Sequence, residues 1–153
     1  MRYAHTQTAP LYLIVVATGI GMIVGAWMAP EQPVQPILTA SGVLMFVLAF
    51  SFQHLTISDQ GDVLLIRFGP LPLFQRRVQY AQIEHVEQAR STILDGWGIH
   101  LSPSGGWTWN LWGFDCVDVW YKMGGKTKKV RLGTDDPTGL AAFLKERLSV
   151  RSA

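Results

Sequence analysis

Apolar residues dominate two long stretches near the start of the chain. Residues 11–29, with the sequence LYLIVVATGIGMIVGAWMA, contain no charged side chain, and neither do residues 36–54. Nineteen helical residues rise about 28 Å, close to the hydrocarbon thickness of a bilayer. The intervening segment from Pro30 to Pro36 holds three prolines, so the chain must turn there. The pattern predicts a transmembrane helical hairpin over residues 11–54, preceded by a short tail over residues 1–10.

Three other structures are alternatives for these stretches. Two buried helices of a water-soluble protein would show the same composition. A cleaved signal peptide would have a shorter apolar core than residues 11–29, and it would leave the second stretch unexplained. A dinucleotide-binding loop fits poorly, because the third glycine, Gly25, falls one residue too late after Gly19 and Gly21. Membrane spans therefore remain the favoured interpretation.

Small residues recur every four positions in the first apolar stretch. This spacing places them on one helix face, where a second backbone can approach closely. We expect this face to pack within the hairpin, although the same helix of another copy is an alternative partner. The residues are Ala17, Gly21, Gly25 and Ala29.

From Leu55 onward the pattern changes to short alternating runs separated by turn residues. We expect strands near residues 55–58, 63–68, 73–79, 83–89, 97–102, 107–111, 116–122 and 126–133. Asp135 and Asp136 precede Pro137, a combination typical of a helix start. Apolar residues then recur at helical spacing through Leu148.

These elements predict a membrane α+β protein with two parts. The hairpin is followed by a domain over residues 55–149, in which about seven strands form a bent sheet or open barrel. A C-terminal amphipathic helix over residues 137–148 caps the barrel, and residues 150–153 form a tail.

The order of strands and terminal helix resembles that of bacterial pleckstrin-homology-like domain proteins, which often carry a pair of membrane helices. The resemblance rests on Phe68-Gly69, on residues 76–83 (RRVQYAQI) and on residues 129–137 (KVRLGTDDP). With the hairpin, it extends over nearly the whole chain. These motifs are structural, so the resemblance implies a fold rather than an activity, and the tryptophan-rich middle departs from the pattern.

Composition and charge argue against nucleic-acid binding, an intrachain disulfide and a metal site. Charged residues make up 16% of the chain and the formal net charge is +2, which is too little for a protein that must neutralise many nucleic-acid phosphates. The single cysteine, Cys116, cannot form an intrachain disulfide. The four histidines show no metal-ligand spacing, so we expect neither metal nor cofactor.

Candidate catalytic groups are few. An enzyme acting on a membrane-proximal substrate would need folding to bring together at least two of Asp115, Asp118, His85 and His100. No nucleophile elbow or phosphate-binding loop is present in the sequence. We therefore expect a protein that is not an enzyme.

Tryptophans cluster in the middle of the domain. Trp97, Trp107, Trp109, Trp112 and Trp120 fall within twenty-four residues. A core of large rings explains some of them, but tryptophan is also enriched at membrane boundaries and protein interfaces. We expect residues 105–114 to rest on the bilayer or on a partner protein. The contacting side chains would be Trp107, Trp109, Trp112 and Phe114.

Basic side chains suggest a second, weaker surface for anionic lipid headgroups, although a solvated strand edge would show the same charges. Its members would be Lys126, Lys128, Lys129, Arg131, Arg76 and Arg77.

The sequence as a whole predicts a non-catalytic interaction module in the bacterial cytoplasmic membrane. Arg2 precedes the first span and the connecting loop carries only Glu31, so both termini are expected in the cytoplasm. Its partners would be membrane lipids and another integral membrane protein or a second copy, without nucleic acid. An accessory or assembly subunit of a larger membrane complex is the main alternative.

Overall fold

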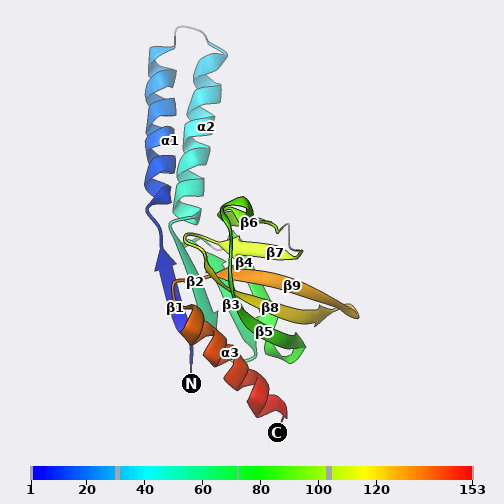
Figure 1. The fold of residues 1–153 in the computed structure, drawn as a ribbon. Helices are drawn as coiled ribbons and strands as arrows, with labels where there is room; N and C mark the ends of the chain where they lie inside the picture. Colours follow the sequence, from blue (N-terminus) through cyan, green and yellow to red (C-terminus); the bar gives the residue numbers. More distant parts are fainter. Residues whose placement is uncertain (1, 30–31, 72, 103–104, 153) are drawn as a thin grey trace.

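Two long helices stand away from a β-rich domain in the computed structural model (Figure 1). The structure describes residues 2–29, 32–71, 73–102 and 105–152. Helices α1 (Leu11–Met28) and α2 (Val34–Ser51) pack antiparallel as a hairpin. Each has 18 residues and is long and apolar enough to cross a membrane. Pro36 lies in the first turn of α2, where a missing N–H breaks no hydrogen bond, so this helix begins earlier than expected.

The hairpin closes through two glycines. A Cβ atom at Gly19 would lie 3.1 Å from the carbonyl oxygen of Gly42, and one at Gly42 would lie 2.7 Å from Cγ1 of Ile23. The two backbones therefore approach at a point where side chains have no room. A Cβ at Gly21 would meet nothing within 4 Å.

The expected packing face of α1 therefore needs correction. Ala17 and Gly21 are exposed, and a Cβ at Gly25 would meet only a leucine methyl group of α2, at 3.8 Å. The i, i+4 series is offset from the contacting face, on which Gly19 and Ala26 are the buried residues. Ala29 lies beyond the helix as its C-cap residue.

A four-stranded antiparallel sheet continues directly from the hairpin. Its order is β1 (Ala4–Thr8), β2 (His54–Asp59), β3 (Val63–Phe68) and β4 (Phe74–Gln79). Strand β1 leads into α1, and α2 leads into β2, so paired strands extend paired helices. The first ten residues, expected as a tail, thus contain an edge strand. Both chain ends lie at the end of the molecule opposite the hairpin loop (Figure 1).

The second sheet has five strands in the order β5-β8-β9-β7-β6. They are β5 (Ile83–Arg90), β6 (Gly98–Leu101), β7 (Trp107–Asn110), β8 (Asp115–Met123) and β9 (Lys126–Gly133). Strands β7 and β9 pair in parallel, whereas the other neighbours are antiparallel. Short 3₁₀ helices, η1 (Tyr80–Gln82) and η2 (Ile93–Asp95), precede and follow β5.

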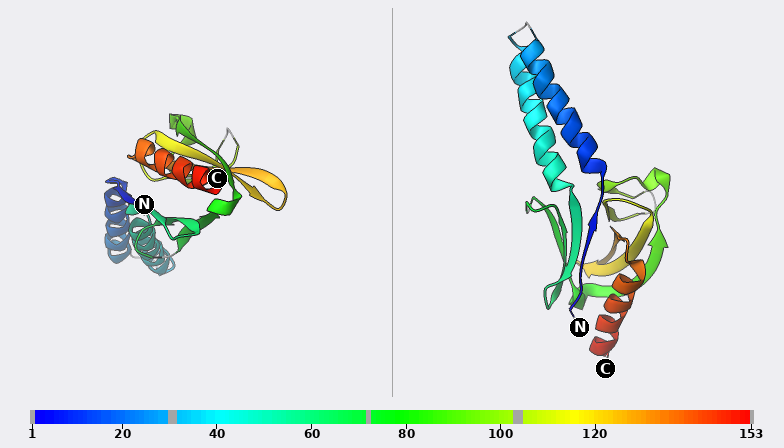
Figure 2. Two further views of the ribbon diagram at one scale, coloured as in Figure 1. Left: turned by 90° about the horizontal axis from the view of Figure 1, so that it is seen from below. Right: turned by 90° about the vertical axis from the view of Figure 1, so that its left-hand side faces the viewer.

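The core lies between the two sheets and the terminal helix α3 (Pro137–Ser152), as Figure 2 shows from two further sides. Leu140 and Leu144 of α3 are buried against the sheets, and Phe143 stacks on Tyr3 near β1, with ring centroids 5.3 Å apart. Asp136 accepts a hydrogen bond from the N–H of Gly139 (2.9 Å), which confirms the expected helix start. The helix extends through Ser152, so the expected tail is mostly helical.

The expected α+β class is confirmed, and each of the eight ranges expected as strands holds one, where about seven strands were predicted for the domain. The expected single bent sheet or open barrel is instead two open sheets of four and five strands, with the C-terminal helix packed on them. Strand β4 belongs to the first sheet and β5 to the second, and the short helix η1 between them connects the two sheets.

Candidate functional site

Two tryptophans form an exposed pair next to the base of the hairpin. The rings of Trp97 and Trp112 stack with centroids 4.7 Å apart and an interplanar angle of 25°. The indole N–H of Trp97 donates to the carbonyl oxygen of Gly113 (3.1 Å), so its polar atom is satisfied within the protein. Trp97 is nevertheless 44% exposed. The pair therefore presents aromatic surface outward while its position is fixed.

Strand β1 ties this aromatic pair to the start of α1. The side-chain amide of Gln7 donates to the carbonyl oxygen of Trp112 (2.9 Å), and Gln7 itself is buried. Gln7 lies only four residues before Leu11, where α1 begins. The exposed tryptophans are thus held at the level where the helices meet the sheets.

An apolar cavity of about 330 Å³ lies between the hairpin base and this part of the five-stranded sheet. The indole of Trp97 forms part of its wall on the sheet side. The other main lining residues come from α1, α2 and the loop after β7, and they are Leu11, Tyr12, Val15, Met45, Leu48 and Leu111.

Three of the four aromatic residues expected at an interface are exposed, and the fourth is buried. Trp107 and Phe114 are exposed, as is Trp112. Trp109 is only 7% exposed, and its ring packs on Phe68 with centroids 5.8 Å apart, so it belongs to the core. Trp107 and Trp109 have the same parity on β7, but Trp107 occupies the strand's first position, beyond the packed core. The structure adds Trp97, which the expected set lacked.

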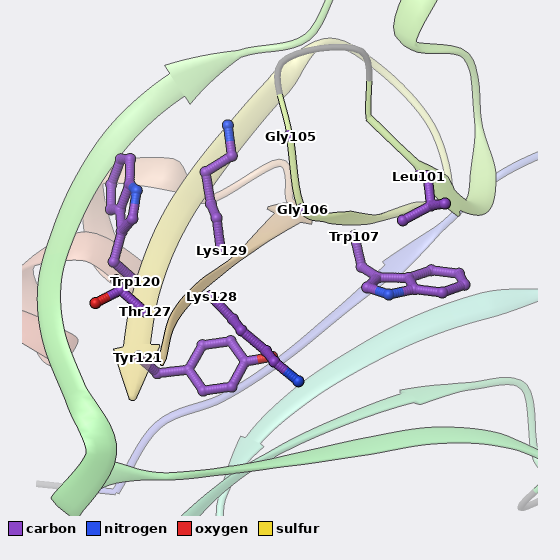
Figure 3. Close-up of a pocket in the computed structure, with 9 residues that line it drawn as sticks. All are labelled: Leu101, Gly105, Gly106, Trp107, Trp120, Tyr121, Thr127, Lys128 and Lys129. Atoms are coloured by element: carbon purple, nitrogen blue, oxygen red, sulfur yellow. The ribbon is translucent and has the colours of Figure 1, made fainter. Parts of the chain in front are cut away.

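A second hollow of about 620 Å³ opens beside Trp107 (Figure 3). Lys128 and Tyr121 line it on one side of the β8–β9 ribbon, and Lys129 and Trp120 lie on the other. Both aromatic rings and basic side chains therefore line this hollow.

Two of the basic residues expected at a headgroup surface are engaged elsewhere. Arg131 is buried and forms two hydrogen bonds to Asp118, at 2.7 and 2.9 Å. The Nζ of Lys129 lies 3.5 Å from the same carboxylate. Their even-numbered neighbour Lys128 is exposed, because alternate strand residues face opposite sides.

The remaining basic residues differ in exposure. Arg76 is half-buried and its guanidinium donates to the hydroxyl of Tyr121, thereby linking β4 to β8. Arg77, Lys126 and Lys128 are exposed. Only three of the six basic residues expected at a headgroup surface are therefore exposed.

A buried ionic cluster anchors the loop that carries Trp97. The guanidinium of Arg131 lies 3.4 Å from Asp95 as well as bonding Asp118. Asp95 also accepts hydrogen bonds from the backbone N–H of Thr92 (2.8 Å) and the hydroxyl of Ser102 (3.1 Å). Asp95 thereby links Thr92, which follows β5, and Ser102, which follows β6, to Arg131 on β9. The turn has a local sequence signal, the capping box of η2, in which Thr92 and Asp95 bond each other; the strand pattern alone does not predict it.

The cluster perturbs the protonation of its members. The N–H of Thr92, more than the other hydrogen bonds, holds the pKa of Asp95 below its usual value, against the opposing effect of burial. The hydrogen bond to Asp118 raises the pKa of Arg131 further above its already high value. Asp95 and Arg131 are therefore charged at neutral pH, and removing Arg131 would leave buried negative charge without its main partner.

The candidate catalytic residues do not converge. Asp115 is exposed and pairs with Arg90 at 3.2 Å, and His85 is exposed beside Glu87. Asp118 and His100 do lie on one row across the sheet, but two strands, β7 and β9, separate β6 from β8. At about 4.8 Å per strand spacing, the two residues are some 14 Å apart. An acid–base pair requires hydrogen-bond distance.

Within the described part of the chain, no group of three metal-ligating side chains lies close together. Cys116 is fully buried on β8, and burial raises the pKa of its thiol. A buried thiol that remains protonated is a poor nucleophile, which fits its role as a small core residue.

Comparison with protein-family models, curated proteins and solved structures finds no match to this chain.

Proposed function

We propose that the protein is a non-catalytic, membrane-anchored interaction module. In this proposal α1 and α2 cross the bacterial cytoplasmic membrane, and the two-sheet domain lies against its cytoplasmic face. There the domain binds lipid headgroups or a partner membrane protein. We regard the two sheets with α3 as a variant of the pleckstrin-homology-like fold, on the strand and helix order.

The observation that carries the proposal is the surface of the hairpin. Among the described residues of α1 and α2, the fully buried ones are Gly19, Ala26, Gly42, Ala49 and Ser51. Large apolar side chains such as Ile14, which is 64% exposed, cover the rest of the surface. A water-soluble protein rarely exposes an apolar surface of this extent, whereas a bilayer would cover it.

The connections at the hairpin base support two crossings. Strand β1, before α1, pairs with β2, after α2. Paired strands must lie on the same side of the membrane, so the chain between them enters and returns. Two helices of 18 residues each span about 27 Å, which suits this path.

Aromatic residues are positioned for both boundaries of the bilayer. Trp27, near the far end of α1, is 85% exposed, and Tyr12 lies at the near end beside Trp97. The fifteen-residue separation of Trp27 and Tyr12 corresponds to about 22 Å along a helix. Tryptophan and tyrosine favour the headgroup levels on either side of the hydrocarbon core.

The direction of insertion follows from charge. Arg2 and Arg67 are close to the spans in sequence and belong to the domain side, whereas the far loop carries the acidic Glu31 in the sequence. Basic residues near spans favour the cytoplasmic side. The proposed orientation therefore places the domain and both termini in the cytoplasm.

The anchoring is tested by alkaline carbonate extraction and by protease accessibility of the full-length chain in bacterial membranes. We expect the protein to remain in the membrane pellet, and its domain to be cleaved only in inverted vesicles. Release into the supernatant would contradict the anchor, and cleavage in right-side-out spheroplasts would contradict the orientation.

The interaction role is tested with a photo-crosslinking amino acid at position 112, compared with the same amino acid at position 145. Trp112 stacks on Trp97 beside the hairpin base, whereas Lys145 is exposed on α3, and this helix lies at the end of the domain away from the hairpin (Figure 1). We expect lipid or protein adducts from position 112 and few from position 145. Equal, low yields at both positions would refute the role.

A subunit of a larger membrane complex is the second candidate. It is favoured by the exposed Ala17 and Gly21 on α1, where the open space around Gly21 leaves room for another helix. Crosslinkers at position 21 would then yield a protein adduct of defined mass, which a module that contacts only lipid on this face would not give.

A further inference from the structure

We propose that the apolar cavity at the base of the hairpin holds one hydrocarbon chain of a membrane lipid. This inference rests on the proposed membrane anchor and adds a specific lipid site to it. The cavity lies between α1, α2 and the loop segments that flank β6 and β7. A chain bound there would leave the bilayer core and bend toward the β domain.

The lining chemistry matches a hydrocarbon. None of the nine described residues that line the cavity carries a charge, and eight of them offer only apolar or glycine surface to an occupant once the indole N–H of Trp97 is bonded to Gly113. The hydroxyl of Tyr12 is the remaining side-chain polar group. A polar solute entering the cavity would lose hydrogen bonds to water without replacing them, which disfavours its binding.

The cavity is also large enough to hold part of a chain. Its volume of about 330 Å³ lies within the range of roughly 300–1,000 Å³ that is typical of ligand sites. Engineered apolar cavities of about 150 Å³ already bind benzene. The volume therefore suits a segment of an acyl chain rather than a single small molecule of solvent.

Its position favours a lipid over other apolar ligands. Five of its lining residues belong to the two membrane-length helices, including Val15 and Met45. Outside the cavity, exposed apolar side chains such as Leu13 and Ile14 cover this level of α1. In the proposed membrane position, the lipid chains of the bilayer are the apolar molecules present in excess at the base of the hairpin.

A neighbouring hollow supplies polar contacts for the same molecule. It has a volume of about 680 Å³, and Tyr12 lines both it and the apolar cavity. Its polar residues are Thr8, Gln53 and His54. No aspartate, glutamate, lysine or arginine is among the seven residues that line it in the described chain. An apolar cavity adjoining an uncharged hydrogen-bonding hollow matches the chain and the ester region of a lipid, without selecting an anionic headgroup.

The test uses the fluorescence of Trp97 in the full-length protein, reconstituted in phosphatidylcholine vesicles. The lipids carry bromine, which quenches tryptophan on contact, either near the carbonyl or near the end of the acyl chain. The contribution of Trp97 is obtained by subtracting the signal of Trp97→Phe. We expect chain-end bromines to quench Trp97 at least as strongly as carbonyl-proximal bromines.

Two variants separate the cavity from simple proximity to the membrane. Val15→Phe fills the cavity, whereas Ile14→Phe places the same ring on the exposed side of α1 as a matched control. We expect Val15→Phe to lose the chain-end quenching and to retain carbonyl-proximal quenching, and Ile14→Phe to behave as the unmodified protein. Met45→Phe fills the cavity from α2 and serves if Val15→Phe does not fold.

The outcomes distinguish this inference from the proposed function. Carbonyl-proximal quenching that exceeds chain-end quenching, with equal behaviour of Val15→Phe and Ile14→Phe, would overturn the lipid site and leave the anchor standing. Loss of the protein from the vesicles on carbonate washing would overturn the anchor itself. Substituting phosphatidylglycerol for half of the phosphatidylcholine is expected to leave the chain-end quenching unchanged, and a strong dependence on anionic lipid would contradict the uncharged hollow.

Discussion

Replacing Arg131 by methionine removes the cation at the centre of the buried cluster. Arg131, Asp118 and Asp95 are 8%, 4% and 7% exposed, so the two carboxylates would remain in a site with little water. Breaking a buried ion pair by removing one partner costs about 3–5 kcal/mol. Lys129 remains 3.5 Å from Asp118 and retains part of the attraction, so we expect the lower end, about 3 kcal/mol.

This loss is large enough to measure by thermal unfolding. For a domain of this size each kcal/mol shifts Tm by roughly 4–8 °C, so Arg131→Met is expected to lower Tm by at least about 12 °C. Near-UV circular dichroism of the protein in mild detergent follows the domain, because the tryptophans lie almost entirely within it. The loop that bears Trp97 should also loosen, since Asp95 would lose one of its partners.

A double variant checks the reasoning. In Asp118→Leu/Arg131→Met, one buried charge is removed together with its partner, and an apolar pair of similar size can replace them. We expect the double variant to be clearly more stable than Arg131→Met alone. A Tm for Arg131→Met within 2 °C of the unmodified protein, or additive losses in the double variant, would refute the role of the cluster.

Three further predictions concern the domain and the hairpin. The pKa of Asp95 and that of Asp59 are both below the usual value; for Asp59, burial opposes the shift but hydrogen bonds outweigh it. Their stabilising effect is therefore complete above about pH 4 and lost as the pH falls through the lowered values, so Tm should fall in acid and Asp95→Asn should flatten that fall. Gly42→Leu should disrupt contact between the helices, measured by energy transfer between dyes on them, whereas Gly21→Leu should not, because only the first position is closely packed; equal effects would contradict this packing. Deleting Ala4–Thr8 should expose the edge of the four-stranded sheet and cause aggregation in size-exclusion chromatography, and a monodisperse, equally stable product would contradict the role of this strand.

Much of the fold could be predicted from local pattern. The eight strands after the hairpin lie within one or two residues of the expected ranges, because alternation of apolar and polar residues is a direct consequence of strand geometry. The start of α3 was predictable for a similar reason, since Asp136 and Pro137 satisfy the first turn locally. Such features depend on neighbours in sequence.

Features that depend on distant neighbours were missed. Ala4–Thr8 is short and polar, and it becomes a strand only because β2 offers an unpaired edge. The division into two sheets depends on which strands pair, which alternation does not specify. Burial of Trp109 and exposure of Trp107 differ for the same reason: their parity is equal, but only one is covered by Phe68.

The same limit applies to the basic residues. Lys128, Lys129 and Arg131 look alike in sequence, yet Arg131 is buried because Asp118 on the neighbouring strand lies directly opposite it. A cross-strand partner of opposite charge was visible only once the register of β8 and β9 was fixed. The apolar cavity at the hairpin base likewise combines residues from both helices and from the five-stranded sheet.

The most direct test of the membrane anchor is a spin-label scan along α1 in reconstituted vesicles. Single cysteines at positions 13, 14, 20 and 24, which are exposed in the structure, are introduced into a Cys116→Ala background. If α1 crosses the bilayer, collisions with oxygen will be frequent and collisions with a water-soluble nickel chelate rare, with the contrast greatest at position 20. Frequent collisions with the nickel chelate at all four positions would show that the helix lies in water, and the account of this protein as a membrane-anchored module would be wrong.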